Sequence, residues 1–124
     1  MTRIFTVPFS LAVPAAATYN QASTILTNLT SLIGAYLIFP SGTGNAMQYR
    51  FYEAPSKPTN PLIAPSGKPI GRDFIDDPFY VGDGIAYPVM WQETPADSNE
   101  CIIIAVTNNS TITLNAQALV TLAQ

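Results

Sequence analysis

Prolines and glycines punctuate most of the chain, with eleven prolines and seven glycines among its 124 residues. Proline lacks an amide donor and both residues favour turns, and helical patterns are nearly missing from the sequence. Several of the segments between them alternate apolar and polar residues, as half-buried strands do. This pattern predicts an all-β protein, a single-domain β-sandwich over residues 1–124, jelly-roll-like, with seven or eight antiparallel strands.

The clearest strand patterns fall in six segments. We expect strands over residues 4–9, 35–39, 47–53, 85–94, 101–107 and 111–122. Pro8 places the first of them at a sheet edge. The second and third resemble a hairpin joined by the Pro/Gly-rich turn 40–45, and the last two resemble a hairpin joined through Asn108, Asn109 and Ser110.

Two segments have ambiguous patterns. Residues 22–33 carry Leu and Ile at helical spacing, which fits a short helix, whereas their β-branched residues favour a strand. Residues 1–17 imitate a signal peptide, with Arg3 before an apolar stretch and alanines after it. Pro8 interrupts that stretch and favours an edge strand instead. A strand is the favoured alternative in both segments, and a short helix stays open for residues 22–33.

Residues 54–72 form the most proline-rich part of the chain. The repeated loss of amide donors excludes a central strand, so we expect a long, extended and partly polyproline-like loop. Long loops of this kind are often functional, and we predict an arm that lies on neighbouring subunits. The interface candidates are Pro55, Pro58, Pro61, Leu62, Ile63, Pro65 and Ile70 in this arm, together with Phe5, Leu119 and Leu122 near the chain ends.

The chain carries few charges. Charged residues make up 10% of the sequence, against about 25% in an ordinary soluble domain. The net charge is −3 and the five cations are scattered, so the sequence has no basic stripe for nucleic acid. No apolar stretch approaches the roughly 20 residues of a membrane span. Low charge promotes association, so the composition is typical of a protein that neighbours cover.

Residues suited to catalysis are scarce. The sequence has no histidine, which excludes Ser-His-Asp and Cys-His sites. Its one cysteine, Cys101, opens an apolar run and is interpreted as a core residue, and it cannot form a zinc site by itself. A Gly-rich phosphate loop is absent as well. We therefore predict no catalytic residues, no cofactor and no enzymatic activity.

Half of the eight acidic residues cluster in one segment, as Asp73, Asp76, Asp77 and Asp83. Carboxylates bind calcium, but this spacing does not match a calcium loop, so these are weak metal candidates. Paired carboxylates could also hydrolyse sugars, although nothing in the sequence sets their separation. Asp-Pro and Asp-Gly pairs are typical of solvated turns, which is the favoured interpretation.

Aromatic residues are the remaining candidates for ligand binding. Tyr49, Tyr52, Tyr80, Tyr87 and Trp91 could form a platform for a sugar ring, but alternation places most of them on inward-facing positions. Core or interface packing is therefore the favoured interpretation. A carbohydrate-binding module that uses Trp91 or exposed tyrosines is the alternative function.

Four segments, taken in order, carry a resemblance to known proteins: Gly34 to Gly42, Tyr49 to Tyr52, Leu62 to Pro65 in the proline-rich loop, and Ala105 to Asn109. This order of strands and turns resembles small jelly-roll or β-sandwich proteins of viral particles, chiefly those of tailed phages and related viruses. Such proteins serve as decoration, minor capsid or spike-base subunits.

The resemblance implies a virion structural protein, located in the virion. Its partners would be copies of itself, a major capsid protein or another virion protein, with neither nucleic acid nor membrane as a partner. The alternative is a carbohydrate-binding β-sandwich module on a cell or particle surface, with a glycan receptor as its partner. The pattern contains no catalytic or ligand motif, so it assigns no functional residues.

Overall fold

The computed structural model describes residues 3–56, 67–71 and 78–124. These residues form nine strands and no helix, which confirms the predicted all-β class. The strands are β1 (Ile4–Val13), β2 (Ala17–Ala22), β3 (Ser31–Ile38), β4 (Met47–Ala54), β5 (Lys68–Pro69), β6 (Tyr80–Val81), β7 (Ala86–Glu93), β8 (Cys101–Asn108) and β9 (Leu114–Ala123).

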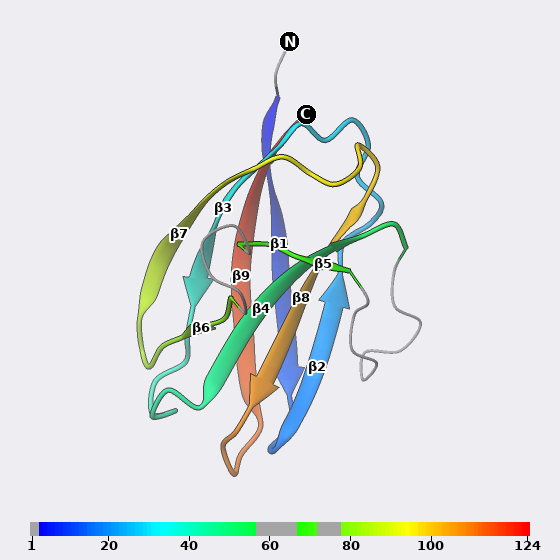
Figure 1. The fold of residues 1–124 in the computed structure, drawn as a ribbon. Coiled ribbons are helices and arrows are strands. Elements are labelled where there is room, and N and C mark those ends of the chain that lie inside the picture. Colours follow the sequence, from blue (N-terminus) through cyan, green and yellow to red (C-terminus); the bar gives the residue numbers. More distant parts are fainter. Residues whose placement is uncertain (1–2, 57–66, 72–77) are drawn as a thin grey trace.

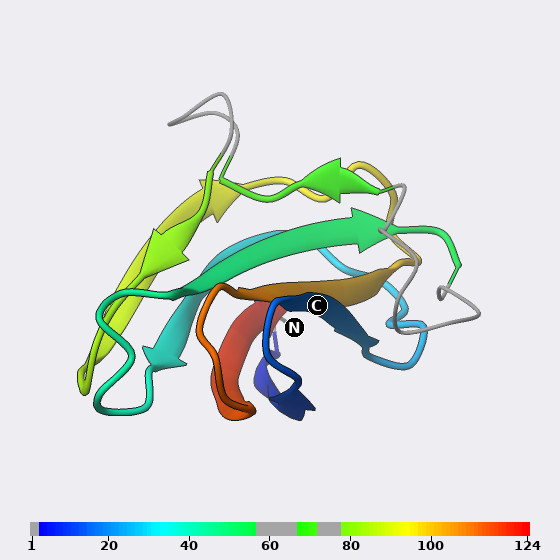
Figure 2. The same cartoon turned by 90° about the horizontal axis from the view of Figure 1, so that it is seen from below.

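The strands form two antiparallel sheets that face each other (Figures 1 and 2). One sheet has the order β1-β9-β3-β7, and the other has the order β2-β8-β4-β5, with β6 also paired to β4. In Figure 2 the red β9 lies below the orange β8, so these consecutive strands belong to different layers. The predicted β-sandwich is confirmed.

Strand pairing in this sandwich is nested. The first strand pairs with the last, β2 pairs with β8, β3 with β7, and β4 with β5 and β6. β5 and β6 pair with different parts of β4, at Tyr52–Glu53 and at Gln48–Tyr49, so together they fill one strand position. Eight strand positions with this nesting are the arrangement of a jelly roll.

Both predicted hairpins are wrong. β3 and β4 follow each other in sequence but lie in different sheets, and so do β8 and β9. The buried Asn108 stabilises the connection from β8 to β9. Its Nδ2 donates to the carbonyl oxygens of Val13 at 2.9 Å and Ile112 at 2.8 Å. Turn residues show where a chain reverses, but not whether the next strand lies beside the previous one or across the sandwich from it.

The helix considered for residues 22–33 is also wrong. Between β2 and β3 the chain is extended, and its backbone pairs with a distant segment. The amide of Leu26 donates to the Glu100 carbonyl at 2.8 Å, and the Glu100 amide donates back at 3.0 Å. The amide of Leu29 donates to Ser98 at 2.8 Å. Backbone groups committed to these distant partners are not available for helical bonds.

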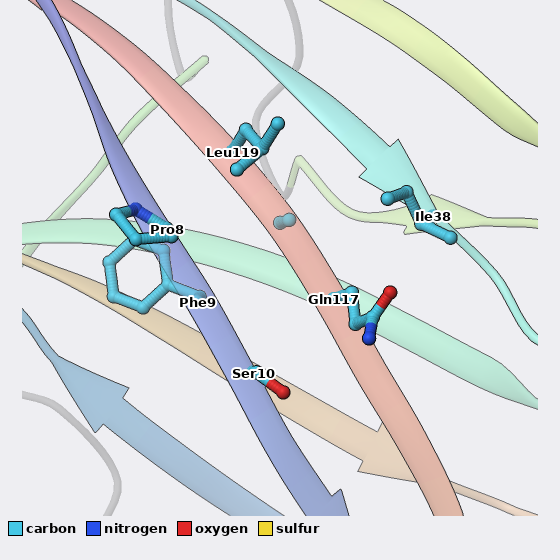
Figure 3. Close-up of a pocket in the computed structure, with 7 residues that line it drawn as sticks. Pro8, Phe9, Ser10, Ile38, Gln117 and Leu119 are labelled. Atoms are coloured by element: carbon cyan, nitrogen blue, oxygen red, sulfur yellow. The ribbon is translucent and has the colours of Figure 1, made fainter.

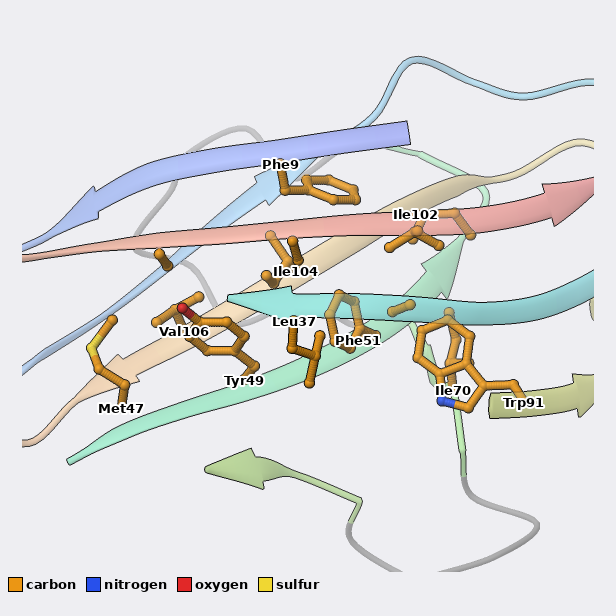
Figure 4. Packing of buried hydrophobic residues seen from close by; sticks show 14 of the residues in the cluster. Phe9, Leu37, Met47, Tyr49, Phe51, Ile70, Trp91, Ile102, Ile104 and Val106 are labelled. Carbon is orange, nitrogen blue, oxygen red and sulfur yellow. The ribbon is translucent and has the colours of Figure 1, made fainter. Parts of the chain in front are cut away.

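The core lies between the two sheets and is rich in aromatic residues (Figure 4). Met47, Tyr49 and Phe51 alternate along β4 and are fully buried, as their spacing predicts. The Phe51 ring meets Trp91 of β7 edge to face, with ring centroids 5.3 Å apart. Cys101, interpreted from the sequence as a core residue, is also fully buried.

Candidate interaction surface

The outer face of the β1-β9-β3-β7 sheet is uncharged, and we call it the open face. Side chains alternate along each of these four strands, all within the described residues, and every outward-facing one is apolar or neutral. Three of its largest apolar side chains are exposed: Leu119 by 39%, Tyr36 by 43% and Met90 by 73%. A sheet face with this composition is typical of a surface that another molecule covers.

An apolar row crosses the open face at right angles to the strands. In the strand register Pro8 lies opposite Leu119, Leu119 opposite Tyr36, and Tyr36 opposite Pro88. The row therefore includes one residue from each of the four strands. Residues directly opposite each other on one face are in contact distance, so the row forms a continuous apolar strip.

A shallow groove of about 230 Å³ lies beside this row (Figure 3). Figure 3 shows Pro8 of β1 and Leu119 of β9 on either side of it, with Ile38 of β3 farther along. The lining is uncharged and consists of Pro8, Phe9, Ser10, Ile38, Gln117, Ala118 and Leu119. The groove is suited to an apolar or neutral side chain of a partner.

On the outer face of the other sheet the apolar residues of β8 are buried, and we call it the closed face. Cys101 and Ile103 point outward from its central strand β8, yet they are 0% and 1% exposed. Ala22 of β2 and Tyr52 of β4 pack against them. Beside them the Arg50 guanidinium lies 5.0 Å from the centroid of the Phe79 ring. The apolar outer positions of β8 are thus buried, with Tyr52 among the side chains packed on them.

One end of the sandwich holds three buried glutamates: Glu53, Glu93 and Glu100. Glu93 Oε1 accepts a hydrogen bond from the Gly71 amide at 2.7 Å. Both oxygens of Glu53 accept from the Ala96 amide at 3.2 Å. These carboxylates therefore hold two loops that the sheets do not pair.

Glu100 lies in the same cluster without a full set of partners. Its Oε2 is buried and accepts no hydrogen bond among the described residues. Burial, with the neighbouring Glu53 carboxyl, raises the pKa of Glu100 to about 7. Lys68 Nζ lies 3.7 Å from Glu53 Oε1 and supplies a positive charge at the edge of the cluster. Sequence reasoning missed this group, because Glu53 and Glu100 are distant in the chain and neither lies in a recognisable motif.

Asp83 has a structural role. Its Oδ1 accepts hydrogen bonds from the amides of Gly42 at 2.7 Å and Thr43 at 3.1 Å, and its Oδ2 accepts from Gly44 at 3.2 Å. These backbone donors, Thr43 first, lower the pKa of Asp83. The carboxylate therefore ties the turn after β3 to the loop before β7. The other calcium candidates, Asp73, Asp76 and Asp77, lie outside the described residues.

Two of the predicted interface residues are wrong. Ile70 and Leu122 are 1% and 0% exposed and belong to the core, so a neighbouring molecule cannot reach them. The Ile70 amide donates to the Phe51 carbonyl at 2.9 Å, which draws this end of the proline-rich segment inward.

The other predicted interface residues have different positions. Leu119 lies on the open face, and Pro55 is exposed where the proline-rich segment begins. Phe5 is half-buried against the core. The remaining candidates, Pro58, Pro61, Leu62, Ile63 and Pro65, lie outside the described residues.

Trp91 is unsuited to stacking on a sugar. It is 1% exposed, and its Nε1 donates to the Tyr80 hydroxyl at 2.9 Å inside the sandwich.

In the described ranges no group of three or more acidic or thiol side chains is placed to hold a metal ion. The same ranges contain no helix of the length and apolar character needed to cross a membrane.

No protein-family model matches this sequence, and no protein of curated function matches it either. Among solved structures, the chain is similar to the VP2 subviral particle of infectious bursal disease virus, with 14% identity and a TM-score of 0.48 over 98% of this chain and 32% of that chain. It is also similar to infectious bursal disease virus of the Gx strain, with 14% identity and a TM-score of 0.41 over 99% of this chain and 30% of that chain. The chain spans about a third of the length of these proteins, and similarity at this level establishes neither a family nor a function.

Proposed function

We propose that this chain is a non-enzymatic structural subunit of a virion that acts through contacts with copies of itself or with other virion proteins. The observation that carries this proposal is the uncharged open face, which exposes Leu119, Tyr36 and Met90 on one sheet. A large apolar face is costly in a free monomer and stabilising in an assembly.

Two further observations support the role. The nested strand order is that of a jelly roll, an architecture that viral capsid domains use among others. The order of strands and turns in the sequence resembles small structural proteins of viral particles. Because one fold serves many functions, these two observations support the role only together with the open face. The more specific roles that fit are decoration, minor capsid and spike-base subunits.

The direct test is the composition of particles. Virions purified by density gradient from the virus that encodes this chain should contain the chain in a fixed ratio to the major capsid protein, as measured by quantitative mass spectrometry. The chain should stay with the particle through repeated banding. A chain that is absent from banded particles, but present in infected cells, would contradict the virion role.

The proline-rich segment is proposed as a second contact, with Pro55 exposed at its start. Since Ile70 belongs to the core and Lys68–Pro69 pairs with β4, a deletion must spare both. Replacing residues 57–66 with a short Gly/Ser linker should leave a folded protein that joins particles poorly. A folded variant that joins particles as well as the parent would refute this contact.

The glycan-binding alternative is not favoured by any single contact. Trp91 is buried, and the exposed Tyr36 lies within the apolar row rather than in a pocket with polar groups. Glycan-array binding that is lost on Tyr36→Ala would revive this alternative.

A further inference from the structure

The open face is large enough for a weak, specific interface. Strands in an antiparallel sheet lie about 4.8 Å apart and rise about 3.4 Å per residue. Four strands of 8 to 10 residues therefore span about 19 Å by about 30 Å. Two such faces packed together bury about 1,100 Å², slightly above the roughly 1,000 Å² expected of a biological interface.

The lack of charge on this face determines which partner it fits. A charged partner would lose hydration there and gain no ion pair. A second copy brings the same neutral surface, so no like charges meet. Self-complementarity of this kind is the requirement for a two-fold dimer, in which one patch packs on the same patch of the other subunit.

We propose, building on the structural role above, that the open face binds the open face of a second copy about a two-fold axis along the row Pro8, Leu119, Tyr36 and Pro88. Each residue of this row then meets its own counterpart. The two sheets pack face to face with their strands roughly aligned, as sheets do inside a sandwich.

Side-chain sizes on either side of the row fit this axis. On β7, Met90 and Ala86 lie two residues to either side of Pro88, and the two-fold axis brings Met90 of one copy over Ala86 of the other. Met90 is the most exposed large apolar side chain on the face, at 73%. A protruding side chain therefore meets a small one on each side of the axis, both times at the β7 edge of the interface, so the two surfaces are complementary there.

Sedimentation equilibrium of the purified chain tests the dimer. The wild-type chain should show a reversible monomer–dimer equilibrium that depends on concentration. Leu119→Lys places two like charges at the axis and should weaken the dimer by about 10- to 100-fold. Leu119 faces outward, so circular dichroism should show an intact fold. Ile112→Lys is the matched control, because Ile112 is 60% exposed in the turn before β9 and lies outside the four strands. This variant should change the dissociation constant of the dimer by less than about twofold.

Cross-linking tests the position of the axis. Leu119→Cys should form a covalent dimer with a short bis-maleimide, because the axis brings the two introduced thiols face to face, whereas Ile112→Cys should not. The native Cys101 is fully buried and should stay unmodified in the folded protein.

The outcomes separate this inference from the virion role. A wild-type chain that stays monomeric at millimolar concentration, or a dimer weakened equally by Leu119→Lys and Ile112→Lys, would overturn the proposed dimer. A monomeric chain whose Leu119→Lys variant fails to enter particles would also overturn it, and would assign the open face to another virion protein. A chain that dimerises through the open face in solution but is absent from purified particles would support the proposed dimer and contradict the virion role.

Discussion

The two outer faces of this sandwich are both formed by antiparallel strands, but their apolar residues differ in exposure. On the closed face, Ile103 points outward from the central strand β8 and is only 1% exposed. On the open face, Leu119 points outward from the central strand β9 and is 39% exposed. The flanking residues also differ: Tyr52 and Arg50 lie opposite outer positions of β8, whereas Pro8 and Tyr36 lie opposite Leu119.

This difference shows how a chain with few charges buries the apolar residues of one outer face and leaves those of the other accessible. Tyr52 packs against the buried outer positions of β8. Leu119 lies between Pro8 and Tyr36 and stays accessible. The open face therefore keeps accessible apolar surface of the kind proposed above to bind a partner, and neither face carries a continuous charged surface.

The largest effect should come from a matched pair of truncations. Ile103→Ala opens a cavity in a fully covered site and should lower the free energy of unfolding by about 2–4 kcal/mol. Leu119→Ala removes a side chain from an open site and should change it by less than about 1 kcal/mol in a dilute, monomeric sample. Urea unfolding followed by Trp91 fluorescence measures both. Equal losses for the two variants would remove the distinction between the faces.

The buried glutamates at the end of the sandwich should make stability depend on pH. The pKa of Glu100 is raised from 4.5 in the unfolded chain to about 7 in the folded one. The folded state therefore binds this proton more tightly, so stability should fall as pH rises from about 4.5 to about 7, and then level off.

Glu100→Gln removes this titration and should gain about 1–3 kcal/mol over wild type at pH 8, with little difference at pH 4. Denaturant unfolding at both pH values measures the difference. Glu93→Ala is the comparison variant, since it removes the acceptor of the Gly71 amide and should lose stability at both pH values. Parallel pH profiles for wild type and Glu100→Gln would exclude Glu100 as the titrating group.

Arg50 should contribute to the cover of the closed face. Arg50→Ala removes the contact with the Phe79 ring, and we expect a loss of about 0.5–1 kcal/mol. Gln117→Ala, on the open face, should change stability by less than about 0.5 kcal/mol. Thermal unfolding of the two variants in parallel provides the comparison, and a larger loss for Gln117→Ala would reverse the roles of the two faces.

The smallest effect should be local. Asp83→Asn keeps the shape of the side chain but removes the charge that accepts three backbone amides. We expect faster hydrogen exchange at Gly42, Thr43 and Gly44, with little change elsewhere. Because its pKa is lowered in the folded chain, the contribution of Asp83 should be present at neutral pH and be lost as pH falls into the acid range. Unchanged exchange at these amides would show that the turn does not depend on the carboxylate.

The candidate surface was only partly predictable from the sequence. Leu119 was identifiable because it is apolar at the outward parity of its strand. Tyr36 and Met90 were not, since nearly all their neighbours are apolar too and the strand alone does not show which face is covered. Ile70 and Leu122 were misassigned for the converse reason: apolar residues near a loop or a chain end look accessible until the packing around them is known.

Alternation and turn residues determined, by themselves, that this protein is all β and that Met47, Tyr49 and Phe51 point into its core. Those are local properties, because a strand repeats every two residues whatever it pairs with. Only the tertiary structure decided that consecutive strands cross between sheets, that Glu53 and Glu100 meet, and that Leu119 lies in an uncovered row. Each of these depends on contacts between distant segments, which local patterns do not specify.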